Sequence, residues 1–340
     1  MIANKLDFIN EQTSPLFRIM WVHNPTEPAR RQFENNICAF HIGNGLILSV
    51  AHNIKSDGRI FKTIEESIYQ TEILSNLNPH QAQVFNQAYR PDPSTNKRYF
   101  SVTNPQETDV IAETLKQINF DTRWLNLMQR NFCKPHLIVQ FRNNRFYNNE
   151  NLTEHFNANT YFHEPSLNRH TFLIEVELVE AFYSEDIALY KIANTHQSIV
   201  DSLPTVEPDF SILDDNQSNL YCLQSSPNSS LGRLLNKAII EGYIDHHGTF
   251  PERIGGNYNF EGTRYLIRGY FRFGSSGAPY VFYDPGKKIY KANAIQSEAS
   301  PIQLSIKNNR DGNFQYVNAI ASPLNIIHER LQPYLSDSKN

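Results

Sequence analysis

Residues 37–52 read ICAFHIGNGLILSVAH, and this stretch decides the fold class. Two short apolar runs, 37–42 and 45–50, surround a turn at Gly43-Asn44. Asn and Gly tolerate the positive φ that a tight hairpin turn requires, and the two runs are rich in β-branched or aromatic residues, which favour strands. The stretch therefore predicts an antiparallel hairpin that leads directly into His52.

Short strand-like runs recur along the rest of the chain. They lie at 17–22, 136–141, 171–176 and 186–192, and then at 220–223, 238–243, 265–268, 280–283 and 291–295. This pattern is typical of an all-β barrel or sandwich. The Pro-containing stretch 197–217 predicts a linker between two β-rich halves, 1–196 and 218–322. Ser322-Pro323 predicts the N-cap and first residue of a closing helix over 323–335.

A helical pattern interrupts the first half between about 57 and 132. Thr63-Ile64-Glu65-Glu66 has the form of a capping box. Asn78-Pro79 and Asn104-Pro105 each place an N-cap before a Pro at the first helical position. We predict a helical insertion here. Its apolar faces either pack on the parent domain or form a groove for a regulatory protein partner.

Composition excludes several classes of protein. The 340 residues carry a net charge of −4, so there is no basic excess to indicate nucleic-acid binding. No apolar run reaches the length of about 18 residues that a membrane-spanning helix needs, and the N-terminus lacks a signal-peptide pattern. Cys38, Cys133 and Cys222 fit neither a disulfide framework nor a metal site. We expect a cytoplasmic protein with no membrane contact, although export by a route without such a signal stays open.

Three short motifs carry the chemistry, in the order His, Asp, Ser. They are SVAH at 49–52, DIAL at 186–189 and GSSGAP at 274–279. Each one alone is commonly structural, because a Gly-Ser run is an ordinary turn and an Asp that opens a strand is usually solvated. Together they supply a base, an orienting carboxylate and a nucleophile. The pKa of an unperturbed His, about 6.5, suits a general base near neutral pH.

These motifs resemble the T-A-A-H, D-I-A-L and G-D-S-G-G-P motifs of the trypsin-like, chymotrypsin-fold serine proteases. The resemblance implies two antiparallel six-stranded β-barrels with the site in the cleft between them. It also implies that Ser276 is the nucleophile, His52 the general base and Asp186 the orienting carboxylate. The α/β-hydrolase esterases are disfavoured, because their triad begins with the Ser.

The resemblance also implies roles for residues around the triad. The backbone N–H groups of Gly274 and Ser276 form the oxyanion hole. Tyr270 lies at the floor of the specificity pocket, while Ser297, Glu298 and Ala299 pair with the substrate backbone. No acidic residue lies between Gly262 and Ser276, so we expect a preference for small or uncharged residues before the scissile bond.

Two departures from the family pattern matter. Ser275 replaces the Asp that binds a newly cut N-terminus in members activated from zymogens, so that mode of activation is not expected. Ala278 replaces the second Gly of the motif, as the G-x-S-G-x-P form of intracellular bacterial and viral members permits. Cys38 stands where secreted members place a disulfide cysteine, and we interpret it as a small buried hydrophobic residue.

The sequence therefore predicts a serine endopeptidase that cleaves a polypeptide substrate through an acyl-enzyme, with no metal and no cofactor. The alternative is a catalytically silent, protease-like module that recognises a partner through the helical insertion. His246-His247 is interpreted as a solvated turn rather than a metal site.

Overall fold

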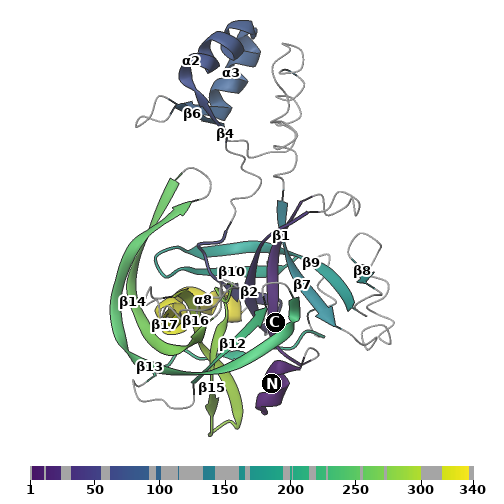
Figure 1. Ribbon diagram of the computed structural model, residues 1–340, viewed down its shortest axis with the longest axis vertical. Coiled ribbons are helices and arrows are strands. Elements are labelled where there is room, and N and C mark those ends of the chain that lie inside the picture. The colour runs from purple at the N-terminus through teal and green to yellow at the C-terminus, as the bar shows by residue number, and fades with distance from the viewer. Residues whose placement is uncertain are drawn as a thin grey trace, which may run out of the picture.

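Two closed β-barrels form the body of the molecule (Figure 1). The computed structural model describes residues 2–10, 13–23, 32–54, 62–91, 97–100, 114, 133–141, 161–164, 169–193, 200, 202–213, 220–226, 229–252, 256–271, 274–299 and 316–336.

The first barrel has six antiparallel strands. They are β1 (Leu16–His23), β2 (Gln32–Gly43), β3 (Leu46–Ser49), β7 (Cys133–Phe141), β9 (Arg169–Phe182) and β10 (Ile187–Ile192). Their order is β10-β3-β2-β1-β7-β9, and pairing of β9 with β10 closes the barrel. A short strand, β8 (Tyr161–Glu164), extends the sheet beside β9. The predicted hairpin is present, because β2 pairs with β3 through Phe40–Leu48.

The second barrel repeats this architecture. Its strands are β12 (Leu220–Ser226), β13 (Ser229–Glu252), β14 (Gly256–Phe271), β15 (Pro279–Asp284), β16 (Ile289–Ala299) and β17 (Tyr316–Pro323). The order is β16-β15-β12-β13-β14-β17, and β17 closes the barrel against β16. In the linker, β11 (Glu207–Pro208) adds a short parallel pairing with β16. The prediction of an all-β fold with two antiparallel six-stranded barrels is confirmed.

One apolar core holds the two barrels together. A single cluster of buried residues includes Phe40 and Leu189 of the first barrel, Leu223 and Ile295 of the second, and Leu331 near the C-terminus. Removing this apolar surface from water is the main driving force for the packing. The barrels therefore meet along a shared core, which brings loops from both of them together.

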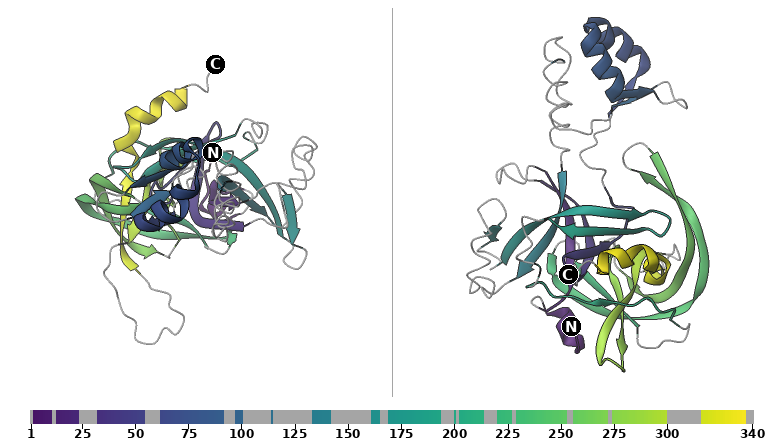
Figure 2. Two further views of the ribbon diagram at one scale, coloured as in Figure 1. Left: turned by 90° about the horizontal axis from the view of Figure 1, so that it is seen from above. Right: turned by 180° about the vertical axis from the view of Figure 1, so that it is seen from behind.

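Strands β13 and β14 continue well past the second barrel as a two-stranded ribbon. Their register runs without a break from Gly242↔Leu266 to Glu252↔Gly256, and Figures 1 and 2 show the pair as a long arc. The prediction that His246-His247 forms a solvated turn is wrong, because both residues lie within β13. Cross-strand pairing, which a local pattern does not reveal, extends the strand through them.

The described part of the predicted insertion contains both helices and strands. It comprises β4 (Lys62–Glu65), α2 (Glu66–Ile68), a short π-helix (Tyr69–Ile73), a 3₁₀ turn (Leu74–Asn76), α3 (Pro79–Ala88), β5 (Tyr89–Pro91) and β6 (Lys97–Phe100). The prediction for Asn78 is confirmed, since its side chain accepts from the N–H of Gln81 at 2.9 Å. The capping box at 63–66 is wrong, because Thr63 and Ile64 pair with β6 as a strand. Asn104-Pro105 lies outside the described residues, and an insertion over 57–132 stays a prediction.

The chain closes on a helix, as predicted. It begins with a 3₁₀ turn (Leu324–Ile327) and continues as α8 (His328–Ser336). The predicted cap is wrong by one residue, because Ser322 and Pro323 are the last residues of β17 and the Pro323 backbone is still extended. In the part of the chain described here, no helix has the length and apolarity needed to cross a membrane.

Candidate active site

His52 and Asp186 form a close pair on the first barrel. Nδ1 of His52 lies 2.8 Å from Oδ2 of Asp186, and the backbone N–H of His52 donates to Oδ1 at 2.8 Å. The Asp186 carboxylate is buried, whereas 15% of the His52 side chain is exposed. Two contacts to one carboxylate fix both the position and the orientation of the imidazole ring.

A tight turn places Asp186 for this contact. The N–H of Glu185 donates to the carbonyl of Phe182, and that of Asp186 to the carbonyl of Tyr183, each at 3.1 Å. Asp186 has a φ of +54°, a left-handed conformation that Asp tolerates better than most residues. The turn joins β9 to β10, and β10 pairs with β3, the strand that precedes His52. Sheet pairing therefore brings the SVAH and DIAL motifs together.

The carboxylate of Asp186 is held in its ionised form. Burial has the largest single effect and raises the pKa of this carboxyl, but the imidazole of His52, the hydroxyl of Ser297 and the backbone N–H of His52 together outweigh it. The pKa therefore lies below its ordinary value. At neutral pH a buried negative charge faces Nδ1 of His52, and it stabilises both the N–H on Nδ1 and a positive charge on the ring.

Strand β16 of the second barrel supplies a third contact to this carboxylate. The Ser297 hydroxyl donates to Oδ2 of Asp186, and Ser297 is buried. The next residue, Glu298, faces Nε2 of His246 on the β13–β14 ribbon, with 3.3 Å between its Oε1 and the ring nitrogen. Ala299 pairs with Ala319 of β17. Substrate pairing by these three residues stays a prediction.

The Gly-Ser loop before β15 packs directly on the first barrel. The N–H of Cys38 in β2 donates to the carbonyl of Ser276 at 2.9 Å, and that of Gly277 donates to the carbonyl of Gln296 at 2.9 Å. Gly277 has a φ of +86°, and a Cβ there would lie 1.9 Å from the carbonyl oxygen of Cys38. Only glycine fits this approach, which places Ser276 between the two barrels.

Ser276 lies on a loop of the second barrel that approaches β3 of the first: a Cβ at the next residue, Gly277, would lie 2.6 Å from the hydroxyl of Ser49, three residues before His52. Among the described contacts there is no hydrogen bond between the ring of His52 and the hydroxyl of Ser276. Catalytic hydrogen bonds in free enzymes are often long and tighten only around substrate. Gly274 has a φ of +85°, and the described residues offer no acceptor to the backbone N–H groups of Gly274 and Ser276. An oxyanion hole at these groups stays a prediction.

A buried arginine lies behind this loop, and the sequence analysis did not anticipate it. Arg18 of β1 is 1% exposed. Its Nη1 donates to the Gly274 carbonyl at 3.1 Å, to the Ser225 hydroxyl at 3.0 Å and to the Cys38 sulfur at 3.3 Å. Cys38 is fully buried and free, yet it contacts a cation as well as apolar neighbours. The hydrogen bond from Arg18 fixes the position of the Gly274 peptide.

Tyr270, the predicted floor of the specificity pocket, lies near the end of β14. Its side chain is 36% exposed, and its carbonyl accepts from the Gln224 amide at 2.9 Å. A pocket floor is an enclosed position, so the exposure of this ring gives the assignment no support. The specificity pocket stays a prediction.

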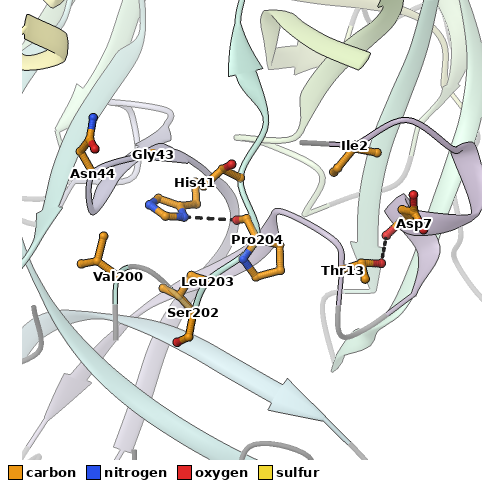
Figure 3. A pocket seen from close by; sticks show the side chains of 11 residues that line it. Ile2, Asp7, Thr13, His41, Gly43, Asn44, Val200, Ser202, Leu203 and Pro204 are labelled. Carbon is orange, nitrogen blue, oxygen red and sulfur yellow. Dashed lines mark hydrogen bonds between the residues drawn. The ribbon is translucent and has the colours of Figure 1, made fainter. Parts of the chain in front are cut away.

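A separate cavity of about 590 Å³ lies beside the turn between β2 and β3 (Figure 3). His41 lines it. The N–H of Gly45 donates to Nε2 of His41 at 3.1 Å, so the ring proton is on Nδ1, which lies 3.2 Å from the carbonyl of Pro204. Burial lowers the pKa of His41 to about 4. A neutral ring with both nitrogens bound secures the linker and is not available as a base.

The described residues include no cluster of three or more His, Cys, Asp or Glu side chains suited to a metal ion.

Comparisons with known proteins found similarity in structure alone. No protein-family model and no curated protein matches the sequence. The Rv3671c protease from M. tuberculosis in its active form has a TM-score of 0.44 and 10% identity, and the match covers 97% of this chain and 84% of that one. A mutant of Rv3671c in an inactive form has a TM-score of 0.43 and 9% identity, with 100% and 94% covered. The inactive form of the protease has a TM-score of 0.41 and 9% identity, and the match covers 97% of this chain and 93% of that one.

Proposed function

We propose that the protein is a serine endopeptidase in which His52, Asp186 and Ser276 act together. One observation carries the proposal: a buried, ionised carboxylate lies 2.8 Å from Nδ1 of His52 and also binds the backbone of the same residue. A structural histidine needs only a neutral acceptor. A carboxylate in this position lets the ring take up a proton and hold it as an imidazolium.

The setting of Ser276 supports the role of nucleophile. Its loop is held by backbone contacts to β2 and to β16, and glycines at 274 and 277 keep side chains out of the approach. A serine hydroxyl is a poor nucleophile until a base removes its proton, and we assign that role to His52 because its ring is already paired with the Asp186 carboxylate.

The proposed reaction has two halves. Nε2 of His52 takes the proton of the Ser276 hydroxyl as Oγ bonds to the carbonyl carbon of the scissile peptide. The carbonyl oxygen becomes an oxyanion that the N–H groups of Gly274 and Ser276 stabilise. His52 then gives its proton to the leaving amine, and the C–N bond breaks. Water, deprotonated by His52, hydrolyses the acyl-enzyme ester and restores the free hydroxyl.

Labelling with a fluorophosphonate probe tests the proposal, because the probe phosphonylates a serine only when a base activates it. We expect stoichiometric attachment to Ser276 in the wild-type chain, located by peptide mass spectrometry, together with hydrolysis of a peptide library. The Ser276→Ala variant should lose both while keeping a cooperative unfolding transition. Ser75, an exposed serine in the 3₁₀ turn Leu74–Asn76, is the control, and Ser75→Ala should keep both the labelling and the hydrolysis.

Two results would contradict the proposal. One is a well-folded wild-type protein that takes up no probe and cleaves no member of the library, which is the behaviour of a catalytically silent binding module. The other is a Ser276→Ala variant that cleaves at a rate comparable to wild type, which would remove Ser276 from the mechanism.

A further inference from the structure

Arg264 of β14 is a buried cation beside the turn that carries Asp186. The residue is 0% exposed. Its Nη2 donates to the carbonyl of Ser184 at 2.5 Å, and its Nη1 donates to the carbonyl of Thr263 at 3.2 Å. Nε is buried and has no hydrogen-bond partner among the described residues. An arginine is rarely buried completely without a strong reason, because removing its charge from water is costly.

The ribbon that carries Arg264 supplies a second donor to the same carbonyl of this turn. The backbone N–H of Glu261 donates to the same Ser184 carbonyl at 3.1 Å. Between these residues, Gly262 has a φ of +151°, and a Cβ at Gly262 would lie 3.0 Å from Nη1 of Arg264. Two donors of the second barrel therefore bind one carbonyl of the first barrel, two residues before Asp186.

Several charges surround this guanidinium. The carboxylates of Asp186, Glu185 and Glu298 raise the pKa of Arg264, although burial has the larger effect and lowers it. Glu185 also pairs with Arg330 of α8 at 2.5 Å. Glu298 faces His246, and Asp186 faces His52. Arg264 is the buried cation in this group, whereas 45% of the Arg330 side chain is exposed.

We propose that Arg264 is a positioning residue for the triad, holding the Ser184–Asp186 turn so that the Asp186 carboxylate meets Nδ1 of His52. This inference rests on the proposed function. Arg264 touches no reacting atom and acts through the backbone of the turn. Arginine suits the task because its planar fork donates to two carbonyls at once, which the single ammonium of a lysine does not reproduce.

The test compares Arg264→Met, Arg264→Lys and a control, Arg268→Met. Arg268 lies on the same strand and pairs with Glu241 at 3.1 Å, but 55% of its side chain is exposed. For Arg264→Met we expect kcat for peptide hydrolysis to fall about 10- to 100-fold, because a misplacement of about 1 Å in a catalytic group costs about that much. KM should stay within about twofold. Arg264→Lys should recover part of the loss, and Arg268→Met should match wild type.

A spectroscopic readout separates positioning from a general loss of stability. The proton between Nδ1 of His52 and Asp186 should give a low-field NMR resonance in the wild type, because a hydrogen bond to a carboxylate deshields it. We expect this resonance to persist in Arg264→Lys and in Arg268→Met. In Arg264→Met it should broaden or vanish through exchange with water, at a temperature where the variant remains folded.

The possible outcomes decide the inference. A folded Arg264→Met variant with wild-type kcat and an unchanged resonance would overturn it. If Arg264→Met does not fold, Arg264→Lys decides: a severalfold lower kcat at constant KM supports the inference, and wild-type kcat overturns it. If the wild type takes up no probe at Ser276, the proposed function fails, and the resonance alone then shows whether Arg264 positions Asp186.

Discussion

The two ends of the β2–β3 hairpin each hold a histidine, and they treat it in opposite ways. At the turn between β2 and β3, both ring nitrogens of His41 are bound by backbone groups, and its pKa falls to about 4. At the site end, His52 meets a buried carboxylate and keeps part of its ring exposed. In both rings the neighbours favour the proton on Nδ1. Burial, the acceptor on Nδ1 and the access to Nε2 together decide which ring is suited to chemistry.

The largest expected effect comes from removing the carboxylate that distinguishes the surroundings of His52 from those of His41. Asp186→Asn replaces the carboxylate with an amide, whose N–H₂ would face Nδ1 and force the proton onto Nε2. His52 then has no lone pair to accept the proton of Ser276. The equivalent change in Ser–His–Asp proteases lowers kcat by about 10⁴. We expect a loss of that order, measured with a peptide substrate at pH 7.

A Glu241→Gln variant provides the control for this substitution. It removes a carboxylate that pairs with the exposed Arg268, and should leave kcat within about threefold of wild type. If Asp186→Asn kept near-normal activity, the contrast between the two histidines would have no functional meaning.

Glycines sharpen the same comparison. Gly277 at the site end would place a Cβ against the Cys38 carbonyl, whereas a Cβ at Gly43 in the hairpin meets nothing within 4 Å. Both residues have positive φ, so each Gly→Ala change carries backbone strain of about 1–2 kcal/mol. Overpacking adds about 1–3 kcal/mol at Gly277 alone.

Urea unfolding of both variants measures the difference. We expect Gly277→Ala to lose about 2–5 kcal/mol of unfolding free energy and Gly43→Ala about 1–2 kcal/mol. Equal losses would show that the close approach of the loop to β2 is not what requires glycine.

The third prediction concerns pH. The pKa of His41 is about 4 in the folded protein and about 6.5 in the unfolded chain. As pH falls below 6.5 the unfolded chain binds the proton first, so the contribution of His41 to stability is present above pH 6.5 and is lost on approach to pH 4. The loss is about 3 kcal/mol.

Denaturant titrations at several pH values check this expectation. Wild type should lose stability steadily between pH 6.5 and pH 4. His41→Gln, although less stable at pH 7, should be flatter over the same range. Parallel curves for the two proteins would show that other groups control acid unfolding.

Much of the fold was predictable because it follows from local patterns. The hairpin at 37–50 and most barrel strands combine apolar, β-branched residues with turn residues at their ends. The ends of elements were harder. Thr63 and Ile64 form a strand because they pair with β6, and Pro323 ends a strand because β17 closes a barrel. Such pairings depend on residues that are distant in the sequence.

The candidate site divides in the same way. The motifs containing His52, Asp186 and Ser276 were visible as short sequences, and the structure shows that His52 and Asp186 are in contact. The supporting cations, Arg18 and Arg264, were not anticipated. Each lies within a strand of apolar and polar residues, and nothing nearby in the sequence indicates burial. Each is buried where it meets the other barrel: Arg18 contacts Ser225 and Gly274 of the second barrel, and Arg264 contacts Ser184 of the first.

The closure of the second barrel by its last strand has a consequence for synthesis. Until Tyr316–Pro323 have left the ribosome, β14 and β16 are open edges, and β16 is the strand that holds both Ser297 and the loop of Ser276. The loop of Ser276 is therefore fixed only after residues 316–323 have been made, whereas the strands that position His52 and Asp186 come earlier in the sequence. Under the proposed function, the order in which the strands are made would delay peptide hydrolysis until β17 has paired with β14 and β16.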